Sequence, residues 1–230
     1  ALNAIFGGTT YLMNRVLERK DDIRASAEKL AKTKKYWAVV GNGPNKAAAD
    51  EIRIKLSELC YKTISSDFIE DKKHIDLSSE PLILVCAAGN PETVAGDVVK
   101  DTAIFKAHKA SVVVFAEEGE TRFDRIADSV IYVPRAPMPL PVILNTLAGH
   151  LWGYYAASAI DDDAAFFRAF RNEMSLAVVE QDHKNYTLYQ RMLDRNLHRI
   201  LKDFGEQFTE RKNRGVFTLM NARTMTDISL

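Results

Sequence analysis

The sequence predicts an α/β fold with three layers, αβα, built on a five-stranded parallel sheet and followed by an α-helical C-terminal extension. Two observations support the sheet. Short apolar runs without polar alternation are typical of parallel strands that are covered on both faces. Helical segments lie between successive runs, as they do in parallel sheets. The third observation is a change after residue 162, beyond which helical spacing replaces the strand-like runs.

Each element follows from a local pattern. Tyr36–Val40 is a continuous apolar run that ends at a glycine, which indicates a buried strand. Thr63–Ser65 is a weaker strand candidate. The expected strands are 36–40, 63–65, 81–86, 111–115 and 129–133, and the expected helices are 9–33, 46–61, 93–109, 122–127 and 139–160.

The chain is expected to have three parts. Residues 1–35 form a helical linker segment, 36–162 form the α/β domain, and 163–230 form a helical extension and tail. Apolar stripes at helical spacing predict two helices between Phe166 and Gly205. Val216–Leu219 is a doubtful strand.

Charge and cysteine content exclude several classes. Lys plus Arg and Asp plus Glu each total 31, and no basic stripe is evident, so no nucleic-acid partner is expected. The uncharged stretch 136–160 is long enough to span a membrane, but it contains three prolines, and a helix buried in the core or at a subunit interface is expected. Cys60 and Cys86 predict buried, reduced thiols in a cytoplasmic protein. Neither a metal nor a cofactor is expected.

Two loops after predicted strands could hold a ligand, because ligands of open α/β sheets sit beyond the carboxyl ends of strands. In the first, Gly43 and Asn45 precede a helix, where backbone can approach a ligand closely. A simple tight turn is the alternative. In the second, Ala88, Gly89 and Thr93 lead into a helix that Thr93 could cap. This loop is a poor phosphate cradle, because alanines without hydroxyl groups follow the strand.

Glu51, Lys55 and Glu58 are spaced i, i+4 and i+7, which places them on one face of the expected helix. The row could be a solvated set of ion pairs. It could also be a general base beside a cation, a pairing that suits proton abstraction next to a carbonyl. His74, in an expected loop, is either solvated or a proton-transfer group.

Together these residues resemble a known family, the sugar isomerase (SIS) domains, and most of all the second isomerase lobe of the glutamine–fructose-6-phosphate aminotransferases. Ala48–Tyr61 is similar to that lobe's Leu-Glu-Gly-Ala-Leu-Lys-Leu-Lys-Glu-Ile-Ser-Tyr helix. Lys73-His74 falls where the family has Lys-His-Gly, and Asn145–His150 is similar to its Gln-Leu-Leu-Ala-Tyr-His.

The resemblance implies a flavodoxin-like strand order, a homodimer through the SIS helices, and no metal or cofactor. It implies conversion of fructose 6-phosphate to glucosamine 6-phosphate, with Glu58 moving a proton between C1 and C2. By position, Lys55 would hold sugar oxygens, Glu51 would orient the site, and His74 would assist ring opening across a subunit interface.

The sequence also departs from the family. Asp161–Phe167 stands where the family has a tail with a lysine that handles the open-chain sugar, and Ile75-Asp76 replaces Gly-Pro. The family's Ser-x-Ser-Gly-x-Thr phosphate loop belongs to the first lobe, so this chain alone is expected to be catalytically incomplete. The alternative is a non-catalytic SIS module for sugar-phosphate sensing or subunit assembly.

Overall fold

The computed structural model describes the chain except residues 1, 75–79, 218–223, 226–227 and 229–230. It divides into two compact units, Ala1–Ala159 and Ile160–Leu230. The predicted division at residues 35 and 162 stays a prediction. No helix in the described part of the chain is both long enough and apolar enough to cross a membrane.

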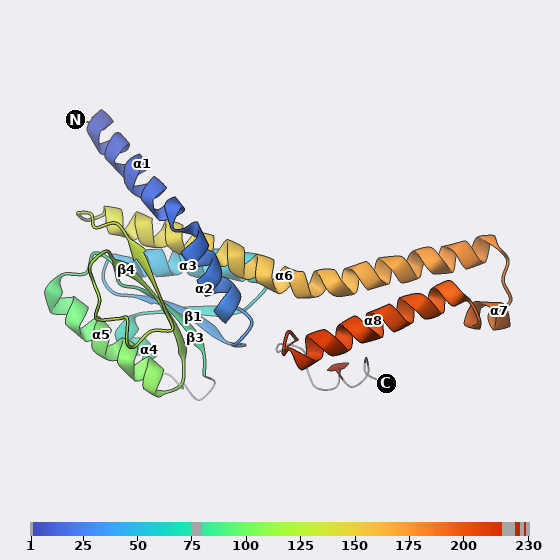
Figure 1. Ribbon diagram of the computed structural model, residues 1–230. Helices are drawn as coiled ribbons and strands as arrows, with labels where there is room; N and C mark the ends of the chain where they lie inside the picture. Colours follow the sequence, from blue (N-terminus) through green and yellow to red (C-terminus); the bar gives the residue numbers. More distant parts are fainter. Residues whose placement is uncertain (1, 75–79, 218–223, 226–227, 229–230) are drawn as a thin grey trace. The chain divides into compact units, whose positions relative to one another are not determined.

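The first unit contains a five-stranded, wholly parallel sheet in the order β2-β1-β3-β4-β5 (Figure 1). This confirms the predicted α/β class and the flavodoxin-like order. Each of the five strands expected between residues 36 and 133 is present, including the weak candidate at 63–65, which corresponds to β2. The strands are β1 (Trp37–Gly41), β2 (Ile64–Asp67), β3 (Leu82–Cys86), β4 (Ser111–Glu117) and β5 (Ser129–Val133).

Helices cover both faces of this sheet, so the unit has three layers (Figure 1). α4 (Ile69–Lys72) and α5 (Glu92–Ala107) lie on one face, where Ile69, Val98 and Phe105 join the strand side chains in one buried core. On the other face lie α2 (Lys20–Leu30), α3 (Asn45–Cys60) and the first part of α6 (Leu140–His183). α1 (Leu2–Glu18) precedes α2.

Close contacts hold the second face together. The indole N–H of Trp152 in α6 donates to the Ser26 hydroxyl of α2 at 3.1 Å, and its ring meets that of Trp37 edge-on. Gly149 and Gly153 lie against Ile52 and Leu56 of α3, which leaves no room for a Cβ. α6 is therefore tied to α2, α3 and β1, which fixes one wall of the candidate site.

Three helix predictions differ from the structure. The predicted 9–33 helix is two helices, separated at Arg19. The predicted 122–127 helix is a series of turns, in which the Phe123 side chain packs into the core. The 139–160 helix is present but continues to His183.

The second unit comprises the end of α6, α7 (Leu188–Met192) and α8 (Arg195–Asn213). The short helix α7 therefore lies between the two helices that were predicted, and a capping box at Thr187 begins it. An aromatic cluster forms the core of the second unit, and the ring centroids of Phe170 and Phe204 lie 3.9 Å apart in it. The doubtful strand is a turn at Val216 and Phe217, and its remaining residues lie outside the described part of the chain.

Candidate functional site

The exposed face of α3 carries the three residues that the sequence spacing placed together. Lys55 Nζ donates to Glu58 Oε2 at 3.0 Å, a hydrogen bond that raises the pKa of Lys55. Glu51 lies one turn before Lys55. All three side chains are between 43% and 57% exposed, so the row meets solvent and is not enclosed.

The structure adds His150 to this row. Its Nε2 lies 3.4 Å from Glu51 Oε1, although the geometry does not make a hydrogen bond. Partial burial is the main cause that lowers the pKa of His150, and the Lys55 charge acts in the same direction, against the opposing effect of Glu51. Sequence spacing could not predict this pairing, because α3 and α6 are far apart along the chain.

His74 is not brought to the α3 face. It follows α4, its side chain is exposed, and its Nε2 lies 3.6 Å from Glu70 Oε1. Glu70 is in turn hydrogen-bonded by Lys73, which is the main reason that its pKa is lowered. Ile75 and Asp76, where the sequence departs from the family, lie outside the described residues.

An amide cluster at the carboxyl ends of β1 and β3 was missed by the sequence reasoning. Asn45 Nδ2 donates to the Ala88 carbonyl at 2.8 Å, and Asn145 Nδ2 donates to Asn45 Oδ1 at 2.9 Å. Asn45 and Asn145 are fully buried, and Asn90 joins them through a 3.4 Å bond. The signal was an asparagine in an otherwise apolar helix, Asn145, since a buried amide needs partners.

The remaining loop residues play different parts. Gly89 has φ +77°, and a Cβ there would lie 2.5 Å from Pro141, so this position requires glycine. Gly43 also has a positive φ but is exposed, with no neighbour near its Cβ position. Thr93 does not cap α5. The N-cap residue is Pro91, which leaves Thr93 inside the first turn with no capping hydrogen bond.

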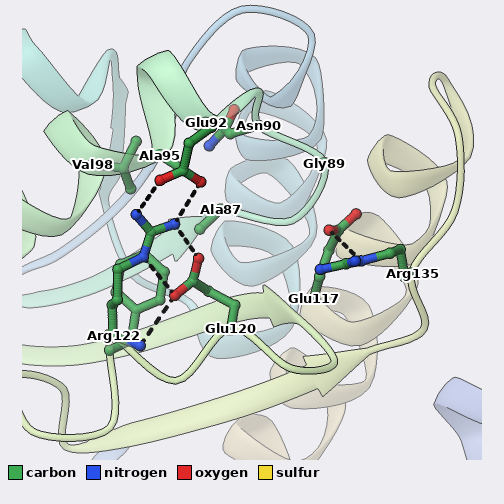
Figure 2. Close-up of a pocket in the computed structure, with 11 residues that line it drawn as sticks. Ala87, Gly89, Asn90, Glu92, Ala95, Val98, Glu117, Glu120, Arg122 and Arg135 are labelled. Carbon is green, nitrogen blue, oxygen red and sulfur yellow. Dashed lines mark hydrogen bonds and ion pairs between the residues drawn. The ribbon is translucent and has the colours of Figure 1, made fainter.

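A cavity of about 140 Å³ opens beside the second loop (Figure 2). Ala87 and Gly89 line it from the end of β3, and Glu117 lines it from the end of β4. Arg122 links Glu92 to Glu120 along its edge. No group of three or more histidine, cysteine or acidic side chains suited to a metal ion occurs in the described ranges.

Comparison with known proteins supports the SIS resemblance. A scan against family models found no match. The glutamine–fructose-6-phosphate aminotransferase (isomerizing) of Chlorobaculum tepidum is 28% identical to this chain over 145 residues, which are 62% of this chain and 23% of that protein. The chain therefore spans about a quarter of the length of this curated relative.

Solved structures share the fold. The C-terminal domain of the glucosamine–fructose-6-phosphate aminotransferase from Francisella tularensis superposes with a TM-score of 0.58 at 17% identity, over 67% of this chain and 44% of that one. The sugar isomerase domain of an RpiR transcription factor from Sphaerobacter thermophilus gives 0.55 at 16% identity, over 72% and 98%. The first unit thus has the SIS fold, and the chain resembles the isomerase part of the aminotransferases.

Proposed function

We propose that this chain binds a sugar phosphate and serves as the isomerase lobe of an aminotransferase-like enzyme that converts fructose 6-phosphate to glucosamine 6-phosphate. The proposal rests on the agreement between the sequence likeness and the side chains of the α3 row. The likeness to the aminotransferases covers 145 residues, and the carboxylate–lysine row on α3 has the chemistry that such an isomerisation needs.

The isomerisation moves one proton between C1 and C2 of the open-chain sugar. Glu58 would be the base that takes and returns this proton. Lys55, at 3.0 Å from Glu58, would stabilise the negative charge that develops on the sugar oxygen. Glu51 would orient the site, and His74 would assist ring opening.

The exposure of the α3 row indicates how such a site would be completed. A base that is 57% exposed works in water, where the neighbouring charges stabilise the transition state less than in an enclosed site. We propose that a second surface covers the row, supplied in a cytoplasmic homodimer formed through the SIS helices. His74, which does not touch the α3 row of its own chain, would reach the partner's row.

Binding of the sugar tests the first half of this proposal. The protein at its natural length is titrated calorimetrically with fructose 6-phosphate and with glucosamine 6-phosphate. We expect saturable heat with both sugars, weakened in Lys55→Gln and unchanged in Lys100→Gln, an exposed lysine on α5. No heat with either sugar would contradict sugar-phosphate binding.

The same titration separates catalysis from sensing. Sugar binding without turnover would favour the non-catalytic SIS module. Neither binding nor turnover would leave subunit assembly as the role of this fold.

A further inference from the structure

The cavity at the carboxyl ends of β3 and β4 is separate from the α3 row, and its lining has two distinct halves. Three carboxylates and two guanidinium groups surround about 140 Å³ of space. That volume holds roughly four or five water molecules, so it suits a small molecule or one end of a larger one. Alanine at positions 87 and 95 keeps the space clear.

One half is closed by its own ion pairs. The Arg122 guanidinium donates to Glu92 at 2.7 and 3.1 Å and also to Glu120, as the dashed lines in Figure 2 show. These bonds engage both oxygens of Glu92 and both oxygens of Glu120 through one guanidinium group. This half therefore offers little to a ligand.

The other half is open. The Glu117 side chain is only 20% exposed, while its ion-pair partner Arg135 is 75% exposed at 3.4 Å. Figure 2 shows the two lying apart from the Arg122 network. No hydrogen bond to the Glu117 carboxylate comes from the described residues. Its ion-pair partner Arg135 is mostly in solvent, so another cation could take the place of Arg135 beside Glu117.

Asn90, which lines the same cavity, has an unused donor that solvent does not reach. Its Oδ1 faces the amide cluster and accepts from Asn45 Nδ2, whereas its Nδ2 is buried and has no partner in the described part of the chain. A buried N–H without a partner is unfavourable, so an oxygen atom of a ligand that accepts from it would be stabilised. Asn90 lines the cavity together with Glu117.

We propose that this cavity is a binding site for a small hydroxylated primary amine, with the ammonium group on Glu117 and a hydroxyl oxygen accepting from Asn90 Nδ2. The ammonium displaces Arg135, whose side chain is 75% exposed and already meets solvent. The inference does not rest on the proposed function, since no residue of the α3 row lines the cavity.

The lining also argues against an anion. The N-terminus of α5 could attract phosphate, but Glu92 occupies the first position of that helix and adds a negative charge there. Arg122, one of the two cations that line the cavity, is already engaged by two carboxylates. A phosphate would meet more negative than positive charge in this cavity.

The test compares two small probes that differ by one group. Ligand-observed NMR titrations of the natural-length protein use 2-amino-1,3-propanediol, with an amine on the central carbon, and glycerol, with a hydroxyl there. Inorganic phosphate is titrated as a third, competing probe. We expect the amine to bind about tenfold more tightly than glycerol, as a charge-assisted hydrogen bond allows, and phosphate not to compete.

Two variants should change amine binding in opposite directions. Glu117→Gln should weaken it about tenfold, whereas Arg135→Gln should strengthen it about two- to fivefold by removing the competing cation. Glu118→Gln is the matched control, because Glu118 pairs with Arg15 and does not line the cavity. Circular dichroism checks that each variant folds.

Several results would overturn the proposal. These are equal binding of the amine and glycerol, no binding of the amine, tighter binding of phosphate, or unchanged amine binding in Glu117→Gln. Loss of amine binding in Glu58→Gln but not in Glu117→Gln would place the amine on the α3 row instead.

Discussion

Asn45 shows how one buried side chain holds two loops at the carboxyl edge of the sheet. Its amide group donates to the Ala88 carbonyl after β3 and accepts from Asn145 in α6. Loss of this side chain would leave a buried carbonyl and a buried amide short of partners.

Asn45→Ala should therefore lower the free energy of unfolding by about 1–3 kcal/mol, since unsatisfied buried polar groups are costly. Urea denaturation measures the change. Asn14→Ala, at an exposed position of α1, is the control and should be nearly neutral. Equal stability of the two variants would show that the amide cluster contributes nothing.

His150, beside the α3 row, makes the stability of the protein depend on pH. Because burial lowers its pKa below the ordinary value near 6.5, the unfolded chain binds this proton more readily than the folded protein. The stability that depends on a neutral His150 is complete above about pH 6.5 and is lost as the pH falls below it.

The melting temperature of the wild type should therefore fall more between pH 7.5 and pH 5 than that of His150→Gln. His183→Gln, at an exposed position, should keep the wild-type slope. Parallel slopes for all three proteins would contradict a depressed pKa at His150.

Individual elements differ in how far the sequence predicts them. Apolar runs predicted β1, β3, β4 and β5, because strands covered on both faces need mainly apolar side chains. β2 was only a weak candidate, because most of its side chains are polar and partly exposed. The prediction of a helix at 122–127 was wrong, because helical spacing does not show that Phe123 packs in the core or that Arg122 donates a hydrogen bond to Glu120. The end of α6 was missed because three aspartates at its predicted end suggested a boundary.

The packing of α3 against α6 depends on glycine. A Cβ on Gly149 would lie 2.4 Å from Ile52 Cδ1, and Ile52 is fully buried. Gly149→Ala should cost a net of about 1–2 kcal/mol, because overpacking outweighs the gain in helix propensity. Chemical denaturation measures the difference.

Two further variants check the cause. Gly96→Ala in α5, where the new methyl meets nothing, should be stabilising by about 0.5–1 kcal/mol. Ile52→Val removes the nearest atom and should recover part of the loss in Gly149→Ala. A double variant with simply additive effects would show that the two side chains do not clash.

On the scale of the whole molecule, the two compact units have separate cores. The aromatic cluster of the second unit includes Phe204, which stacks on Phe170 at 3.9 Å. Phe204→Ala should destabilise only the second unit, because the ring of Phe204 packs in the aromatic cluster of that unit. The expected loss is about 2–4 kcal/mol, less than for a fully buried phenylalanine, because Phe204 is partly exposed. Calorimetry should show one unfolding transition shifted and the other unchanged, and Tyr189→Ala, at an exposed position, should shift neither.

The candidate site was predictable only in part. Spacing on one helix placed Glu51, Lys55 and Glu58 together, because neighbours on one face follow from helix geometry. Spacing could not predict the amide cluster or the partner of Glu117, since their residues come from different strands and helices. Contacts between distant segments need the folded chain.

The central claim is that Glu58 moves a proton between C1 and C2 of the sugar. The most direct measurement is NMR detection of deuterium entering fructose 6-phosphate from heavy water in the presence of the natural-length protein. We predict exchange that Glu58→Gln slows by about 10²–10⁴-fold, as expected for loss of a general base, while Glu18→Gln, at an exposed position of α1, exchanges normally. Exchange at the wild-type rate in Glu58→Gln, or none with the wild type, would contradict the account.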